Sequence, residues 1–463
     1  MKIKSSRTKP KGKVTHVTFT NTADTRFREN GDGTVLEIGI GVKKNIGRRE
    51  FMRVVRKIIR TAKTYKLSVL AIDRKEFSFP KLKNTSSEDL FRLIGENLEI
   101  AEFEFTKFKT KPKDGWPSVR ELTIVGSLTK KEEAALKTGK TVGEYVNLAR
   151  TIANTPGGHM FPEDLFRQAK QAVKGTSVTV SALTEKQMKS LKMEAILAVS
   201  KGSDAHARFI IMEYWGKSRN KKDPVVLCGK GITFDSGGLN IKPGPHMLDM
   251  HLDMSGGAAV IAAVALAGKL KLKQNVVGLI PAVENMPNGN AYRPGDVITS
   301  MSGKTIEVQN TDAEGRVVLA DTLTYAQKYY KPKLLVDVAT LTGAAVGALG
   351  QHASAIMTQD KKLQRKFEEL GEESGDYVWP LPLWNEYDEE VKGRFGDVAN
   401  IGKKPGEGGA ITAGSFLKAF VGNTPWVHID MAPRMTAQPF DNLALGAAGE
   451  PVRLFTRLFE AEN

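Results

Sequence analysis

Residues 306–316 read Ile306-Glu307-Val308-Gln309-Asn310-Thr311-Asp312-Ala313-Glu314-Gly315-Arg316. The pattern predicts a β-strand that runs into a turn carrying two carboxylates and an arginine, and the apolar run 317–325 predicts a helix directly after it. Free backbone N–H groups and the helix dipole favour anions at such a helix start. The stretch therefore indicates either a site for charge chemistry or an ordinary helix start with acidic capping residues.

A second stretch of the same kind lies at residues 225–238, Val225-Val226-Leu227-Cys228-Gly229-Lys230-Gly231-Ile232-Thr233-Phe234-Asp235-Ser236-Gly237-Gly238. Here an apolar run ends in a glycine-rich turn, and Asp253 opens a further helical run. Clustered carboxylates repel one another, so a dry cluster needs a metal or paired cations as countercharge. An oxygen-rich cluster is what a two-metal hydrolytic centre requires. Separate acidic caps on separate turns are the alternative, and spacing alone leaves both open.

Six motifs together resemble the leucyl (cytosol) aminopeptidase family. They follow the family's order through roughly residues 140–460. A single motif of this kind carries a false-positive risk, which several motifs in order reduce. The matching segments are Gly229 to Gly238, Lys242-Pro243, Met250 to Gly257, Asn310 to Arg316, Ala339-Thr340-Leu341-Thr342-Gly343-Ala344, and Gly409-Ala410-Ile411-Thr412-Ala413.

The resemblance implies a metal-dependent aminopeptidase that releases N-terminal amino acids, of leucine-like or broad preference, through a hydroxide bridged by two metals. Two divalent ions, Zn²⁺ or Mn²⁺, would be held by mixed oxygen and amine ligands. Asp235 and Glu314 would be shared, Asp312 would complete the first ion, and Lys230 and Asp253 the second. Lysine binds a metal only as the neutral amine, so an ion pair with a carboxylate is the alternative interpretation of Lys230.

The resemblance also assigns residues around the metals. Lys242 corresponds to a catalytic lysine that stabilises the oxyanion. Arg316, with the backbone amides of Ala313, Gly315 and Leu341, would hold bicarbonate as a proton relay. Residues expected to line the substrate pocket are Met250, Thr340 and Gly343. His251 stands where the family usually carries lysine, which leaves side-chain preference open. Peptides with a free N-terminus are the implied substrates, and a homohexamer is the implied assembly.

Alternating strand and helix patterns predict an α/β protein with a small N-terminal α/β domain. The larger catalytic domain is expected to be a three-layer α/β/α domain, because its later strands are continuous apolar runs typical of a mostly parallel sheet covered on both faces. The predicted parts are a mobile basic arm at 1–13, the N-terminal domain at 14–130, a connecting helix at 131–156 and the catalytic domain at 157–463.

Composition adds three expectations. The 463 residues are enough for two or three domains. The single cysteine, Cys228, excludes an intrachain disulfide and is interpreted as buried packing in a reducing compartment. No secretion signal and no membrane-spanning segment is expected, since the most apolar helix, Met254 to Gly268, is shorter than the roughly 20 residues a bilayer requires. A cytoplasmic protein follows.

The net charge of +16 is concentrated in residues 1–140, which hold 32 Lys and Arg against 17 Asp and Glu. The helix expected at residues 48–60 would present a basic outer face. Such asymmetry indicates either a solvated surface or nucleic-acid binding through the basic N-terminal region. A third hypothesis keeps the metal centre and narrows the substrate: a specialised dipeptidase, such as a cysteinyl-glycine hydrolase.

Overall fold

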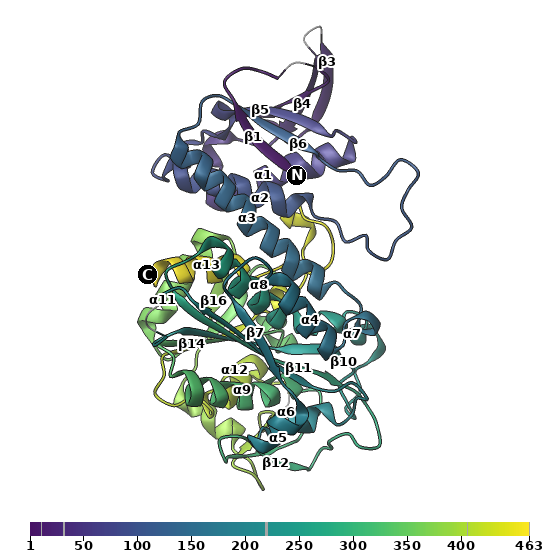
Figure 1. The fold of residues 1–463 in the computed structure, drawn as a ribbon, viewed down its shortest axis with the longest axis vertical. Coiled ribbons are helices and arrows are strands. Elements are labelled where there is room, and N and C mark those ends of the chain that lie inside the picture. The colour runs from purple at the N-terminus through teal and green to yellow at the C-terminus, as the bar shows by residue number, and fades with distance from the viewer. Residues whose placement is uncertain (11, 31–32, 218–220, 405, 463) are drawn as a thin grey trace. The chain divides into compact units, whose positions relative to one another are not determined.

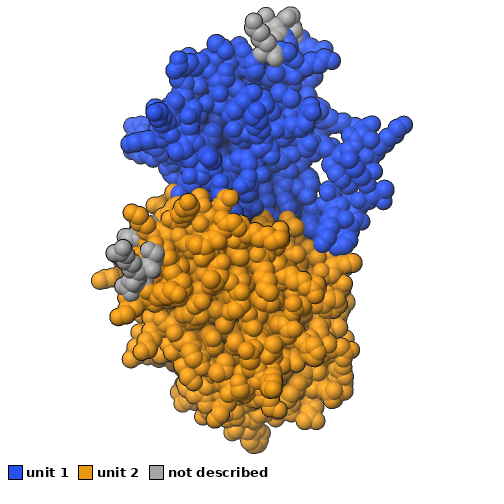
Figure 2. Space-filling model, in the orientation of Figure 1, with its two compact units in different colours: residues 1–147, 437–445 blue, residues 148–436, 446–463 orange. Residues whose placement is uncertain are grey.

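The computed structural model describes residues 1–463 apart from 11, 31–32, 218–220, 405 and 463. These residues form two compact units (Figure 2). Unit 1 comprises residues 1–147 and 437–445, and unit 2 comprises residues 148–436 and 446–463. The division falls within helix α3, Lys130–Ala153, which corresponds to the expected connecting helix. The domain boundaries drawn from sequence stay predictions.

Unit 1 contains a six-stranded sheet in the order β1-β6-β5-β2-β4-β3, in which β3 alone of the described strands is antiparallel to its neighbour. The expected mobile arm instead contains β1, which pairs with β6 and gains its backbone hydrogen bonds there. The elements are β1 Lys2–Ser6, β2 Thr15–Thr20, β3 Arg26–Asn30, β4 Gly33–Gly39, α1 Arg48–Thr64, β5 Val69–Asp73, α2 Ser87–Glu102 and β6 Glu121–Val125.

Helix α1 differs in one residue from the basic outer face expected at residues 48–60. Its apolar residues recur at helical spacing and are buried, as predicted. Arg56, expected on the outer face, is buried too, and its Nε donates to Asn97 Oδ1 at 2.6 Å. A second guanidinium nitrogen donates to the carbonyl of Asp441 at 3.2 Å. A buried charge needs such partners, so Arg56 is a structural residue of unit 1.

Unit 2 is built on a nine-stranded, mostly parallel sheet with the path β16-β15-β18-β14-β9-β11-β8-β7, and β10 pairs with β11 outside this path. The central strands are buried along their whole length, which explains their uninterrupted apolar sequences. The strands are β7 Thr179–Leu183, β8 Arg208–Trp215, β9 Val225–Gly229, β10 Gly231–Asp235, β11 Asn275–Asn285, β14 Leu334–Ala339, β15 Ser354–Met357, β16 Val378–Pro380 and β18 Trp426–Asp430.

Helices cover this sheet on two sides, so unit 2 has three layers (Figure 1). Helices α8, α13 and α4 lie on one side, and α9, α12 and α6 on the other. The helices are α4 Pro162–Ala172, α5 Glu185–Ser190, α6 Glu194–Ser200, α7 Gly244–Met247, α8 Ser255–Leu270, α9 Glu314–Tyr330, α10 Gly343–Leu349, α11 Lys361–Ser374, α12 Gly409–Lys418 and α13 Val452–Ala461.

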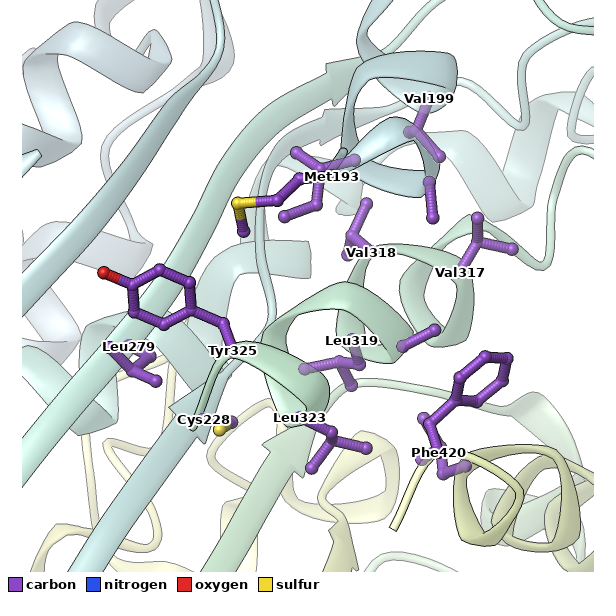
Figure 3. Close-up of a cluster of buried hydrophobic side chains, with 14 of the residues drawn as sticks. Met193, Val199, Cys228, Leu279, Val317, Val318, Leu319, Leu323, Tyr325 and Phe420 are labelled. Carbon is purple, nitrogen blue, oxygen red and sulfur yellow. The ribbon is translucent and has the colours of Figure 1, made fainter. Parts of the chain in front are cut away.

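Helix α9 packs its apolar side chains onto the sheet (Figure 3). Leu319 and Leu323 are fully buried in this cluster together with Cys228 of β9. Cys228 is fully buried, so its interpretation as core packing is confirmed. Burial raises the pKa of its thiol, and Asp337 adds to the shift, which disfavours the reactive thiolate. This packing fixes the axis of α9, whose first turn carries the acidic motif.

The strand expected at residue 306 does not join the large sheet. It is β13, Thr305–Glu307, in a separate three-stranded sheet with β12, Val297–Thr299, and β17, Val398–Ala399. Lys230 follows β9 of the large sheet, and Asp235 ends β10. The loop 308–313 then carries the chain from β13 to the start of α9. The four carboxylates therefore converge from different segments: Asp235 from β10, Asp253 from the short helix Met250–Met254, Asp312 from the loop before α9, and Glu314 from α9 itself.

The apolar helical segment Met250–Leu270 is longer than expected from the sequence. By length and composition it could span a bilayer, but 89% of its most apolar window is buried inside the fold. The segment joins the short helix Met250–Met254 to α8, all of whose residues from Ser255 to Gly268 are buried. It is the central core helix of unit 2, and this burial explains its composition.

Candidate active site

Lys230 directly follows β9 and is deeply buried in the site. Its side chain is 3% exposed, and its Nζ is 2.7 Å from Asp253 Oδ2 and 2.8 Å from Glu314 Oε1. Nζ also donates to the carbonyl of Thr340 at 3.0 Å. The side chain passes over Gly315, where an added Cβ would lie 2.6 Å from Lys230 Cε. Glycine at position 315 is therefore required for this close approach.

Lys242 forms a second bridge between carboxylates. Its Nζ is 2.8 Å from Asp235 Oδ2 and 2.5 Å from Asp312 Oδ1. The glycine turn after β10 brings it there, since Gly237 has a φ of +89° and the backbone N–H of Lys242 donates to the carbonyl of Ser236 at 2.9 Å. Lys242 thus bridges Asp235 and Asp312, whereas Lys230 bridges Asp253 and Glu314.

Three carboxylates meet closely enough to hold a metal ion. Asp235, Asp312 and Glu314 each offer an oxygen, and these oxygens all lie within 4.8 Å of one another. Within the described chain, Glu314 Oε2 is buried without a hydrogen-bond partner. A buried carboxylate oxygen with no donor has a strong affinity for a cation. The residues present therefore fit a divalent metal.

The electrostatics of this cluster favour additional positive charge. Four carboxylates face two ammonium groups, which leaves the cluster negative when all are ionised. Burial raises the pKa of Asp312 to about 6, and Asp235 adds to the shift. Burial also raises the pKa of Glu314, again with a contribution from Asp235. A divalent cation would reverse these shifts because it stabilises the ionised carboxylates.

The two lysines are held in the charged form. Burial alone would lower the pKa of Lys230, but the carboxylates of Asp253 and Glu314 outweigh it and raise the pKa. The same balance, with Asp235 as the largest neighbour, raises the pKa of Lys242. The ion pair considered for Lys230 from sequence is present in the structure. A metal that bound Lys230 would have to displace this proton.

Asp253 is anchored by the loop after β14. Its Oδ1 accepts from Thr340 Oγ1 at 2.7 Å. This loop is held in turn by Asp430 at the end of β18, which accepts from the backbone N–H groups of Leu341 at 3.1 Å and Thr342 at 3.4 Å. The sequence motif contains Thr340, but nothing in it indicated Asp430. The only available signal was a carboxylate at the end of a buried strand.

Arg316 is buried in the first turn of α9. Its Nε has no hydrogen-bond partner among the described residues. Burial lowers its pKa to about 10, and the charges of Glu314 and Asp430 oppose this effect. Of the amides assigned to the same anion site, that of Leu341 donates to Asp430 and that of Ala313 to the Asn310 carbonyl at 3.3 Å. The amide of Gly315 lies in the first helical turn, where backbone donors lack intrahelical partners.

Met250 and Gly343, which the resemblance assigns to a substrate pocket, lie on or directly beside the segments that hold the charged groups. Met250 begins the short helix that contains Asp253. Gly343 begins α10, directly after the Thr340 loop, and Thr342 caps this helix by accepting from the Ala345 N–H at 3.1 Å. The structure thus places both residues on segments that carry charged site residues or their hydrogen-bond partners.

Comparison with known proteins identifies the family. The model of the cytosol aminopeptidase family, catalytic domain, matches residues 147–456. The chain belongs to the cytosol aminopeptidase family. It is similar to a probable cytosol aminopeptidase of Saccharophagus degradans, with 40% identity over 438 residues that cover 93% of this chain and 86% of the relative. A probable cytosol aminopeptidase of Clostridium tetani is 41% identical over 423 residues, which cover 90% of this chain and 85% of the relative.

A solved structure shares the fold over almost the whole chain. The bottromycin maturation enzyme BotP in complex with Mn has a TM-score of 0.86 and 28% identity, over 97% of this chain and 99% of that one. This cytosol aminopeptidase-family protein is therefore a peptidase and hydrolase whose substrates are peptides, as the sequence resemblance implied. Its α/β architecture, with a small mixed sheet and a larger mostly parallel one, is confirmed.

Proposed function

We propose that the protein is a metal-dependent aminopeptidase that releases N-terminal amino acids of leucine-like or broad preference. The observation that carries the proposal is the close approach of Asp235, Asp312 and Glu314, where one buried Glu314 oxygen has no hydrogen-bond partner among the residues that the structure describes. Two divalent ions, Zn²⁺ or Mn²⁺, would share Asp235 and Glu314. Asp312 would complete one ion, and Asp253 with deprotonated Lys230 the other. Bound divalent metals acidify water and polarise a carbonyl group, which is the chemistry that peptide hydrolysis needs.

The protein's own residues supply the rest of the chemistry. The charged Lys242 would stabilise negative charge that develops on the scissile carbonyl oxygen. Arg316 and the Gly315 amide would bind bicarbonate, and their place in the first turn of α9 suits an anion. In this proposal the assigned amides of Ala313 and Leu341 would exchange their present partners for that anion. Met250, Thr340 and Gly343 would line the substrate pocket.

A panel of aminoacyl amides tests this function. Metal-stripped protein should be inactive, and added Zn²⁺ or Mn²⁺ should restore release of the amino acid. The panel should include cysteinyl-glycine, because activity confined to that dipeptide would favour the specialised dipeptidase. Folded protein that stays inactive with every metal would overturn the proposal. Cell fractionation tests the proposed cytoplasmic location, which agrees with the names of the relatives.

Substitution of the carboxylates tests their roles. Asp312→Ala and Glu314→Ala should each lower turnover more than about 100-fold. Mutation of a residue that only hydrogen-bonds to a metal ligand already lowers metal affinity or activity about 10–100-fold, and loss of a ligand should do more. Both variants should keep the far-ultraviolet circular dichroism spectrum of the wild type, because each removes one charge from a mutually repelling cluster. Unchanged activity in either variant would contradict the assigned role.

A further inference from the structure

We propose that Asn285 is a positioning residue that fixes the Asp235 and Asp312 carboxylates relative to each other and so sets the affinity of the site for its divalent metal. The inference rests on the proposed function and adds a residue to the same site. Asn285 lies outside the six sequence segments that carry the family resemblance.

The side chain of Asn285 bridges the two segments that supply these carboxylates. Asn285 is the last residue of β11, is fully buried, and pairs in register with Asp235 of β10. Its Nδ2 donates to Asp235 Oδ1 at 2.8 Å and to the carbonyl of Thr311 at 3.0 Å. Both partners only accept hydrogen bonds, so they require the amide nitrogen, and not the oxygen, to face them. Thr311 directly precedes Asp312.

Further hydrogen bonds make this junction stiff. The main-chain carbonyl of Asn285 accepts from the Ser236 N–H at 3.0 Å and from Ser236 Oγ at 2.8 Å. Thr311 Oγ1 donates to the Gly237 carbonyl at 2.7 Å, and the Tyr292 hydroxyl donates to the Thr311 carbonyl at 2.7 Å. The turn after β10 and the loop before α9 are therefore joined across the end of β11, with Asn285 as the side chain that contacts both.

Such a bridge matters because the joined groups repel each other. Asp235 and Asp312 belong to the same close carboxylate triple, and the single charge of Lys242 between them offsets only part of their repulsion, so loss of the Asn285 hydrogen bonds would let the two carboxylates shift relative to each other. Donors to a ligating carboxylate also fix its orientation, and their removal typically costs about 10–100-fold in metal affinity. The side-chain amide of Asn285 orients the Asp235 carboxylate by a direct hydrogen bond. It also holds the backbone carbonyl of Thr311, the residue directly before Asp312.

The test is a calorimetric titration of Mn²⁺ into metal-stripped, full-length protein. Asn285→Ala should raise the Kd for Mn²⁺ by about 10–100-fold relative to wild type. Asn275→Ala is the matched control: Asn275 is the first residue of the same strand and is equally buried, and its side chain contacts the backbone of Lys217 and Lys222. Both variants should lose thermal stability, but the control should keep the wild-type Kd.

The outcomes separate this inference from the proposed function. Wild-type protein that binds neither Mn²⁺ nor Zn²⁺ would overturn the metal-dependent function itself. Wild-type binding with an unchanged Kd in Asn285→Ala would overturn only the role of Asn285, and an equal loss in Asn275→Ala would do the same. If Asn285→Ala does not fold, Asn285→Ser keeps one donor but is too short to bridge both acceptors. Its Kd should also rise, and a wild-type Kd would overturn the inference.

Discussion

At the scale of single residues, the site depends on how closely Lys230 approaches the start of α9. Lys230 forms ion pairs with both Asp253 and Glu314, and Gly315 leaves the space for its side chain. The same lysine is proposed to bind metal as a neutral amine. Protein without metal therefore keeps its carboxylates together through ammonium groups, and metal uptake exchanges a proton for the ion.

Gly315→Ala should disable the site without unfolding the protein. The new Cβ would lie 2.6 Å from Lys230 Cε and 2.7 Å from its Nζ, so the lysine would have to move away from Glu314. We expect metal affinity and turnover to fall by at least about 10-fold. Alanine is favoured over glycine in a helix by about 1 kcal/mol, so the loss of stability should be small.

Titration calorimetry and thermal melting check this expectation. Gly347→Ala is the matched control, because Gly347 also lies in a helix and a Cβ there would meet no atom within 4 Å. The control should behave as wild type in both measurements. If Gly315→Ala bound metal as tightly as wild type, the close approach of Lys230 to residue 315 would not be needed for metal binding.

At the scale of elements, one buried carboxylate connects α6, α9 and the hairpin β12–β13. Asp321 of α9 accepts from the N–H groups of Ala195 at 2.9 Å, Ile196 at 3.1 Å and Met301 at 2.7 Å. The first two donors lie in the first turn of α6, where backbone N–H groups lack partners. Burial raises the pKa of Asp321 to about 7, although these donors oppose the shift.

This raised pKa makes stability depend on pH with a defined sign. An unfolded aspartate titrates near pH 4, so between about pH 4 and 7 the folded protein holds a proton that the unfolded chain has lost. The contribution of Asp321 to the free energy of unfolding should therefore fall as pH rises through this window, by at most about 1.4 kcal/mol per unit. It should level off above the folded pKa.

Urea unfolding of metal-free protein from pH 5 to pH 8 measures this dependence. Asp321→Asn should give a flatter profile than wild type, because the titrating group is gone. Asp204→Asn, at an exposed position, should leave the profile parallel to that of wild type. Parallel profiles for wild type and Asp321→Asn would contradict the raised pKa.

At the scale of the whole molecule, we expect a homohexamer, as the family resemblance implied. Unit 2 exposes large aromatic side chains that association would cover: Trp379 is 58% exposed, Trp384 60% and Phe395 73%. Contiguous apolar patches mark interaction surfaces, and large exposed aromatic side chains are what such a patch would contain. Light scattering should give six times the chain mass of 50.7 kDa. A monomer would refute the prediction.

Binding of nucleic acid by the N-terminal region also stays a prediction. Part of the charge there is already neutralised, since Lys4 Nζ lies 2.5 Å from Glu121 Oε1 and Arg48 lies 2.6 Å from Asp89. Salt-sensitive retention on immobilised DNA, lost when the basic residues of 1–13 and of the outer face of α1 are neutralised, would support it. No retention at low salt would end this hypothesis.

The sequence by itself determined the elements and the family. Alternating strand and helix patterns predicted the small N-terminal α/β domain, and continuous apolar runs predicted the mostly parallel large sheet, because such patterns depend only on neighbours along the chain. The motifs at 229–238 and 310–316 predicted which charged residues belong to one site. These motifs place carboxylates and lysines at strand ends and helix starts, and both features can be recognised in the sequence alone.

Only the tertiary structure decided which groups meet. β1 pairs with β6, more than 100 residues away in the sequence, and β13 lies in a separate small sheet. Arg56 is buried and hydrogen-bonded to Asn97 and to the backbone of Asp441. Asn285 and Asp430 lie outside every motif, yet they hold the two halves of the site. Their roles depend on hydrogen bonds to residues 26 to 89 positions away, and no local pattern encodes partners at that separation. The folded sheet brings them together, since strand ends distant in sequence share one edge.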